Sequence, residues 1–467
     1  MFLDIDKRDP NHIAVIDGSE QKMTYGELCS FSSEFYSYIG HRSLVFILCH
    51  NCIAPLAAYV SCLSNRVVPL LLSANTDREM VEHLIEIYHP EYIWGEAEDL
   101  NGLPYEKIYE AYNYSLLKTE LIGFPMYEDL SLLLTTSGST GSAKFVRHSY
   151  ENVIANARNV SRVFEMNESS IGMDSLPLQF TQGLNVATSH LLSGAVVLLT
   201  KANLMQKEFW DFFKKYRAQS MTCVPYSIEL LEKLRFFRMD LPDFQVLNQG
   251  GGRLPDKTFM LCADYAEKTG RKFIATYGST ETTSRMAYLP AELASRKCGS
   301  IGKALPECSL TLIDDSGNVI DQPNEVGEII FKGPNVTLGY AESGADLIKG
   351  DERHGQYATG DLAYFDEDGC FFIVGRKKRF LKIFGYRISL DETERMLKDH
   401  FHIECACVGN DKKMSVFTTA ENREEEIIQY LSEKTNLHRM AFEVRFIETI
   451  PKNDTGKTQY KELESMI

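Results

Sequence analysis

Apolar segments typical of buried strands alternate with amphipathic segments typical of helices from about residue 45 to residue 310. The first part of this region runs in the order "LVFILCH", a helical segment over about 54–64, "VVPLLL", "REMVEHLIEIY" and "EYIW". Such alternation predicts layered α/β sheets with largely parallel strands. Pro and Gly become more frequent from 299 to 340, around the strand-like runs "SLTLID" and "EIIFKG", which indicates a smaller β-rich subdomain.

The carboxy-terminal part of the chain follows another pattern. Two helical segments, "DETERMLKDH" and "EEIIQYLSEKT", are interleaved with the strand-like runs "CFFIVG", "ECACVGN", "MSVFTTA" and "EVRFIE". This predicts a compact α+β module that is large enough to be a domain of its own. A chain of 467 residues is also too long for one ordinary domain, so we expect at least two.

The charge and the first residues disfavour several kinds of partner. The formal net charge of −16 argues against a nucleic acid held by phosphate neutralisation, and against an anionic membrane surface. The start of the chain, "MFLDIDKRDP", has acids where a signal peptide needs bases. No window approaches the roughly 18 apolar residues of a spanning helix. We therefore expect a cytoplasmic protein that binds no nucleic acid and does not insert into a membrane.

Eleven cysteines without regular spacing are typical of reduced thiols in a protein of this length. Cys49 and Cys52 have the spacing of half a redox or zinc site. A zinc site would need a second pair, and none stands out in the sequence. We therefore expect these two cysteines, like Cys405 and Cys407, to be small buried or half-buried thiols.

The stretch from Thr135 to Lys144, "TTSGSTGSAK", follows an apolar run. Glycine lets successive N–H groups point into one concavity, and the hydroxyls and the lysine add further donors for phosphate. The spacing is not that of the common P-loop, since Ala143 and Phe145 stand where that motif needs other residues. Residues 145–149 alternate like a second strand, and Ser149 can cap the helix that follows. The pattern predicts a phosphate-binding loop between two strands, with an ordinary polar hairpin as the alternative.

This loop resembles the phosphate loop of the adenylate-forming superfamily, which includes acyl-CoA synthetases, adenylation domains of peptide synthetases and firefly luciferase. Four more segments resemble motifs of that superfamily in the expected order: "YGSTE" (277–281), "YATGD" (357–361), "GRKKRFLKIFGYRI" (375–388) and "PKNDTGK" (451–457). The resemblance covers essentially the whole chain. It implies a large α/β domain over 1–376, with its β-rich subdomain, and a small mobile α+β domain over 377–467.

The resemblance also implies an activity. Such an enzyme joins a carboxylic acid to the α-phosphate of ATP, releases pyrophosphate, and transfers the acyl group to a pantetheine thiol. That thiol belongs to coenzyme A or to the phosphopantetheine of an acyl carrier protein. Catalysis would rest on positioning and on cations, because charge develops on the phosphoryl oxygens.

Particular residues match the superfamily's binding motifs. ATP phosphates would be bound by Thr136, Ser137, Gly138, Ser139, Thr140, Gly141 and Lys144. Glu281 would supply a hard oxygen for Mg²⁺, and Thr280 would hydrogen-bond the α-phosphate. The adenine would lie against Tyr277, Gly278, Gly250, Gly251 and Gly252.

The later motifs supply the remaining groups. Asp361 would accept hydrogen bonds from the ribose hydroxyls, with Arg376 behind it. Lys457 would be the catalytic cation, a compact ammonium on a long side chain. Lys378 occupies the hinge position of the small domain, and Gly385 would line the path of the thiol in the second step.

The acid itself is left open by departures from the superfamily pattern. Many acyl-CoA synthetases have His where Phe180 stands, and amino-acid-activating relatives place an Asp near Gln179. Because no carboxylate is present there to hold an α-ammonium, we expect a small or medium carboxylic acid. Two alternatives stay open, an amino-acid ligase that charges a carrier protein and an inactive nucleotide-binding protein of the same fold. Lys457 and Glu281 speak against the second, since binding alone does not need both.

Overall fold

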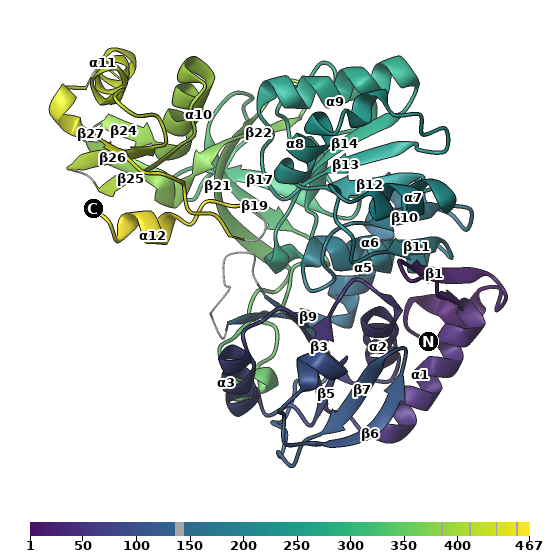
Figure 1. The fold of residues 1–467 in the computed structure, drawn as a ribbon. Helices are drawn as coiled ribbons and strands as arrows, with labels where there is room; N and C mark the ends of the chain where they lie inside the picture. The colour runs from purple at the N-terminus through teal and green to yellow at the C-terminus, as the bar shows by residue number, and fades with distance from the viewer. Residues whose placement is uncertain (136–143, 384–385, 411, 436, 454–455) are drawn as a thin grey trace. The chain divides into compact units, whose positions relative to one another are not determined.

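The computed structural model describes residues 1–135, 144–383, 386–410, 412–435, 437–453 and 456–467. The chain forms two compact units (Figure 1). The larger unit comprises Met1–Ser309 and Phe331–Tyr357, and the smaller unit comprises Leu310–Ile330 and Ala358–Ile467. The smaller unit thus starts earlier in the chain than the predicted boundary after Arg376. The boundary after Arg376 is predicted as the point about which the small domain turns, and it stays a prediction.

A nine-stranded sheet forms one layer of the larger unit. Its central strands β14, β13, β12, β10, β11 and β1 are parallel, while β16, β15 and β2 pair antiparallel at the edges. In spatial order the strands are β16 (Lys303–Ala304), β15 (Ala287–Tyr288), β14 (Lys272–Tyr277), β13 (Val246–Gln249), β12 (Ser220–Cys223), β10 (Ile171–Asp174), β11 (Val196–Leu199), β1 (Ile13–Asp17) and β2 (Lys22–Thr24).

An eight-stranded sheet forms a second layer of the same unit. The parallel strands β8, β4, β3 and β5 lie at its centre and are nearly all buried, because both faces of such a sheet are covered. In spatial order the strands are β20 (Gly339–Ala341), β9 (Phe145–Ser149), β8 (Leu130–Thr135), β4 (Val68–Ser73), β3 (Leu44–Cys49), β5 (Tyr92–Glu96), β7 (Tyr114–Lys118) and β6 (Glu106–Ala111).

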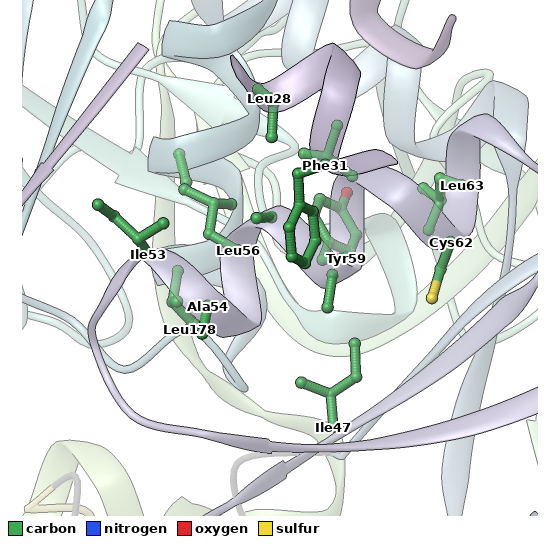
Figure 2. Close-up of a cluster of buried hydrophobic side chains, with 14 of the residues drawn as sticks. Leu28, Phe31, Ile47, Ile53, Ala54, Leu56, Tyr59, Cys62, Leu63 and Leu178 are labelled. Carbon is green, nitrogen blue, oxygen red and sulfur yellow. The ribbon is translucent and has the colours of Figure 1, made fainter. Parts of the chain in front are cut away.

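Helices lie between the two sheets (Figure 1). α2 (Ile53–Ser64) is buried along nearly its whole length, as expected of a helix that is apolar on all sides. It packs with α1 (Tyr25–Ile39) above β3, and Figure 2 shows Phe31, Leu56 and Tyr59 meeting over Ile47. The other helices of this unit are α3 (Arg78–Tyr88), α4 (Ala97–Leu100), α5 (Tyr150–Val163), α6 (Thr181–Leu192), α7 (Lys207–Lys215), α8 (Pro225–Lys233) and α9 (Asp256–Thr269).

The smaller unit is built from three short sheets. A five-stranded sheet contains β18 (Val319–Ile320), β17 (Ser309–Ile313), β19 (Gly327–Lys332), β21 (Gln356–Phe365) and β22 (Phe371–Arg376). A two-stranded sheet contains β23 (Phe380–Ile383) and β24 (Tyr386–Ser389), and a three-stranded sheet contains β25 (Cys405–Asn410), β26 (Lys413–Thr418) and β27 (Phe442–Phe446). Its helices are α10 (Leu390–Phe401), α11 (Glu424–Thr435) and α12 (Tyr460–Glu464).

These architectures confirm the predicted α/β layers, the β-rich segment and the α+β module. All eleven cysteines are free thiols. Burial raises the pKa of Cys49 well above its usual value and that of Cys52 to about 11, which suits unreactive core thiols. Among the residues that the structure describes, no helix is both long enough and apolar enough to span a bilayer.

Candidate active site

The predicted phosphate loop lies between β8 and β9, which pair as an antiparallel hairpin. The strand after the loop is therefore confirmed, and so is Ser149 as the cap of α5, since its Oγ accepts a hydrogen bond from the Asn152 amide. The loop residues Thr136, Ser137, Gly138, Ser139, Thr140 and Gly141 lie outside the described residues. Lys144 closes the loop with its Nζ 3.9 Å from the ring centroid of Tyr340.

The turn Gly250–Gly252 follows β13 directly. A side chain at Gly250 would overlap the amide of Gln182 and the hydroxyl of Thr276, and Gly251 has a φ of +80°. Gln249 stabilises the turn, because its Nε2 donates hydrogen bonds to the carbonyl oxygens of Gly250 and Gly252, at 3.3 and 2.6 Å. The left-handed conformation at Gly251 therefore favours glycine, and three residues without side chains leave the backbone of this turn open to a ligand at the carboxyl end of β13.

The predicted motif Tyr277–Glu281 leaves the carboxyl end of the neighbouring strand β14. The chain then folds back so closely that a side chain at Gly278 would overlap the carbonyl oxygen of Ser284. Thr283 and Ser284 complete this bend with φ values of 51° and 92°, which are strained for residues other than glycine. Carboxyl ends of adjacent strands in an open α/β sheet are where ligands bind, so the structure brings the two predicted adenine-binding segments to one such place.

The carboxylate of Glu281 is held from one side. Its Oε1 accepts a hydrogen bond of 2.8 Å from the Tyr340 hydroxyl, and its backbone oxygen accepts one of 3.0 Å from the Thr337 amide. Burial and the neighbouring charge of Glu281 raise the pKa of Tyr340, so this phenol stays a donor. Among the described residues no hydrogen-bond partner is found for Oε2 of Glu281. An oriented carboxylate with one oxygen to spare fits the hard-oxygen preference of Mg²⁺.

Two further side chains complete this part of the larger unit. Thr280 is buried, with its Oγ1 3.5 Å from that of Thr181 at the start of α6. Arg353 donates to the backbone oxygen of Glu281 at 3.2 Å and lies over the Tyr340 ring, 4.6 Å from its centroid. The sequence analysis missed Tyr340 and Arg353. The only signal for Tyr340 is its place at the end of the segment "GPNVTLGY".

In the smaller unit, Asp361 and Arg376 stand directly opposite each other on β21 and β22. The Arg376 Nε lies 3.2 Å from Oδ1 of the buried Asp361, so the predicted pair is brought together. Lys378 is exposed on the short helical turn that follows, and Gly385 lies outside the described residues. Lys457 is also exposed. Its backbone amide donates to Oδ1 of Asn453 at 2.9 Å, and α12 starts three residues later.

A buried ionic network connects the segment after Lys378 with α12. Arg379 pairs with Asp391 and, at 2.6 Å, with Glu394, and its guanidinium lies 3.6 Å from the ring centroid of Tyr460. The Tyr460 hydroxyl in turn donates to Glu394 at 3.0 Å. The network therefore fixes the start of α12, three residues after Lys457. The sequence analysis read this basic segment only as a hinge motif.

The two-sheet α/β unit fits an ATP-dependent acid ligase of the adenylate-forming class, and the family comparison agrees. The chain belongs to the family of AMP-binding enzymes, whose model matches residues 3–341. This confirms the predicted superfamily and the predicted kind of enzyme, an AMP-forming acid–thiol ligase.

Two curated relatives illustrate the similarity. The chain is 29% identical over 356 residues to 2-succinylbenzoate–CoA ligase of Bacillus anthracis (strain A0248), covering 74% of this chain and 71% of that one. It is 27% identical over 350 residues to indoleacetate–CoA ligase of Aromatoleum aromaticum (strain DSM 19018 / LMG 30748 / EbN1), covering 72% and 67%. The relatives are thus matched over most of their length.

Solved structures share the fold. The o-succinylbenzoate CoA synthetase of Bacillus subtilis in complex with an acyl-adenylate has a TM-score of 0.80 at 21% identity, over 99% of this chain and 97% of that one. ATP-bound MatB of Rhodopseudomonas palustris has a TM-score of 0.78 at 20% identity, over 100% and 98%. At this level of identity the likeness shows the α/β fold, and the roles of individual residues stay predictions.

Proposed function

We propose that this protein activates a carboxylic acid with ATP as an acyl-adenylate and then transfers the acyl group to a pantetheine thiol. The observation that supports the proposal most is that the Gly250–Gly252 turn and the segment leading to Glu281 follow the carboxyl ends of the adjacent parallel strands β13 and β14. A flat glycine surface suits a purine base, and an oriented carboxylate suits the metal ion that accompanies a triphosphate.

In the first step a carboxylate oxygen attacks the α-phosphorus of ATP, the bond to the β-phosphate oxygen breaks, and pyrophosphate leaves. Thr280 donates its hydroxyl to the α-phosphate, and Lys457 offers a positive charge to the oxygens on which charge develops. Glu281 would hold Mg²⁺, which when bound neutralises phosphate charge. Because Tyr340 fixes one oxygen of Glu281, the other is oriented before the ion arrives.

The remaining predicted residues bind the nucleotide. Tyr277 and Gly278 lie against adenine with the glycine turn, and Lys144 and the loop before it bind the outer phosphates. Asp361 accepts from the ribose hydroxyls, and the guanidinium of Arg376 at 3.2 Å holds that carboxylate in place.

In the second step the pantetheine sulfur attacks the acyl carbon, the bond to the phosphate oxygen breaks, and AMP leaves while the thiol proton goes to solvent. Gly385 would line the path of the thiol, and Lys378 would be the hinge about which residues 377–467 turn between the steps. The acceptor is coenzyme A, with the phosphopantetheine of a carrier protein as the second candidate.

We further propose that the acid lacks an α-ammonium, that the enzyme works in the cytoplasm, and that it binds no nucleic acid. The segment from Leu176 to Gly183 contains no carboxylate that could neutralise an ammonium. The named substrates of similar ligases, 2-succinylbenzoate, indoleacetate and oxalate, carry no α-amino group either. These names support a simple carboxylic acid.

The test is acid-dependent exchange of labelled pyrophosphate into ATP, run over a panel of carboxylic and amino acids. We expect exchange with simple carboxylic acids and, after addition of coenzyme A, a thioester detected by mass spectrometry. Exchange with amino acids alone would favour the carrier-charging ligase instead. Absence of exchange with every acid would leave only the inactive nucleotide-binding protein.

A further inference from the structure

A cavity of about 470 Å³ enters the larger unit from the amino-terminal edge of the nine-stranded sheet, the opposite end from the glycine turn. At its outer end it is lined by the exposed residues Glu165 and Gly270, and by Lys272 at the start of β14. At its inner end it is lined by the buried residues Asn248 and Arg285. Solvent can therefore reach a cation that is only 2% exposed.

Among the residues that the structure describes, the hydrogen-bond partners of Arg285 are neutral. Its two terminal nitrogens donate to the side-chain oxygens of Asn185 and, at 2.9 Å, of Asn248. Its Nε has no partner, and among the described residues no carboxylate oxygen lies within 4.0 Å of the guanidinium. The ring of Phe164, with its centroid 5.4 Å away, also faces the charge. A buried cation with no carboxylate in contact is costly, so an anion that reaches Arg285 would be bound strongly.

Two titratable neighbours of Arg285, Asp174 and His190, are themselves buried. Burial raises the pKa of Asp174 well above its usual value, and the Oδ2 of this residue has no hydrogen-bond partner. Burial also lowers the pKa of His190 to about 4, so this imidazole is neutral at pH 7. Burial lowers the pKa of Arg285 only to about 10, and the guanidinium therefore keeps its charge at pH 7.

The inner end of the cavity lies close to the site of adenylate formation. Asn248 precedes Gly250 by two residues of β13, a distance of roughly 7 Å along a strand. Arg285 follows Glu281 by four residues, across the bend at Thr283 and Ser284. A molecule whose reacting carboxylate lies beside the glycine turn could therefore place a second group at Arg285 if a few carbon atoms or a ring separate the two.

We propose that the acid substrate is a dicarboxylic acid, and that its second carboxylate pairs with Arg285 through the free Nε and the terminal nitrogens. This inference rests on the proposed function, since it names the class of acid that the same site activates. A carboxylate is the shared chemistry of two sources, the far end of the substrate and a free anion that enters through the outer end of the cavity.

The experiment compares straight-chain and aromatic dicarboxylic acids with their monomethyl esters in pyrophosphate exchange. The ester keeps the size and removes the second charge. We expect kcat/KM to be at least about 10²-fold higher for the best diacid than for its ester, the scale of a buried charge that gains its partner. In Arg285→Met this ratio should fall to near one, mainly through loss of the diacid, while Arg285→Lys should keep part of it.

Lys272→Gln is the matched control, because it removes a cation from the outer end of the same cavity and should leave the ratio unchanged. ATP binding and the melting curve of each variant show whether the fold survives. Equal activity on diacid and ester in the unaltered protein, or an equal loss of both in Arg285→Met, would overturn the inference while adenylation stands.

A third outcome would show that the carboxylate at Arg285 comes from a free anion and not from the substrate. If free dicarboxylates change the turnover of a monocarboxylic acid without being activated, and Arg285→Met abolishes this effect, the anion is an effector and the substrate assignment is wrong. Absence of exchange with every acid in the unaltered protein would instead refute the proposed function itself.

Discussion

Arg285 in the larger unit and Arg379 in the smaller unit are both largely buried, yet their surroundings are opposite. Residue Arg285 is 2% exposed, and the side chain of Arg379 is 12% exposed. Arg379 faces the carboxylates of Asp391 and Glu394. Although burial lowers the pKa of Arg379, the charges of Glu394, Tyr460 and Asp391 outweigh it and raise this pKa above its usual value. Burial of Arg285 lowers its pKa, and only Asp174 opposes the shift.

The difference separates a structural arginine from one that is available to a ligand. A guanidinium whose donors meet two carboxylates and a carbonyl is satisfied by the fold itself. The terminal nitrogens of Arg285 instead meet amide oxygens, so none of its hydrogen bonds goes to a carboxylate. Burial alone therefore does not say whether an arginine binds a ligand, whereas the charge of its partners does.

The largest expected effect is on the satisfied arginine. Arg379→Met should lower the free energy of unfolding of the smaller unit by about 3–5 kcal/mol, because the buried carboxylate of Glu394 and the partly exposed one of Asp391 lose their partner. Arg285→Met should cost less, about 1–3 kcal/mol, since only amide oxygens are left unpaired. Denaturant unfolding followed by circular dichroism measures both. Arg395→Met, which removes an exposed partner of Glu392 on α10, is the control. Similar losses for Arg379→Met and Arg285→Met would contradict the comparison.

Lys457→Ala tests an exposed cation of the smaller unit, in contrast to the buried Arg379. We expect adenylate formation to fall by about 10²–10³-fold, by analogy with the loss of one charge-stabilising donor, while the melting curve stays unchanged. Single-turnover pyrophosphate release is the measurement, and Lys461→Ala on the adjoining helix is the control. An unaltered rate would remove Lys457 from the mechanism.

Glu281→Gln keeps the shape of the side chain and removes the charge that is proposed to bind Mg²⁺. The Mg²⁺ concentration for half-maximal exchange should rise by at least the roughly 10- to 100-fold that follows changes behind a metal ligand. Glu292→Gln, an exposed acid on the same stretch of chain, should leave the titration in place. Superimposed titrations of Glu281→Gln and the unaltered protein would mean that the ion is held elsewhere.

Tyr340→Phe should give the smallest effect. It removes the hydrogen bond to Glu281 and keeps the ring that lies against Lys144 and Arg353. Loss of one such bond corresponds to roughly a two- to tenfold rise in the Mg²⁺ requirement. The same titration measures it, and combination with Glu281→Gln should add nothing further. Additive effects would show that Tyr340 does not act through Glu281.

Much of the fold could be predicted from the sequence because its signals are local. The strands and helices from β3 to β5 follow directly from the alternation of apolar runs. The extent of the smaller unit could not be predicted in this way. Residues 310–330 belong to it because β17 and β19 share a sheet with β21 and β22, which come much later in the chain. Pairing between distant strands leaves no periodic signal in either of them.

The candidate site likewise contains contacts that the sequence could predict and contacts that it could not. Asp361 and Arg376 belong to one antiparallel strand pair, so motifs that are close in sequence placed them together correctly. Tyr340 and Glu281 are 59 positions apart, and Arg285 and Asn185 are 100 apart. A sequence contains no record of such contacts, because the residue types involved are equally common on surfaces. For the same reason the buried charge of Arg285 was invisible before the structure.

The bend between Glu281 and Arg285 also bears on how this protein can change over evolutionary time. Thr283 and Ser284 hold left-handed backbone conformations, and Asn335 donates to the carbonyl oxygens of Thr282 and Arg285, at 2.7 and 2.9 Å. An inserted or deleted residue would displace both ends of the bend at once. Descendants of this chain that acquire new acids should therefore differ by replacement at position 285 while the length of this segment is inherited unchanged.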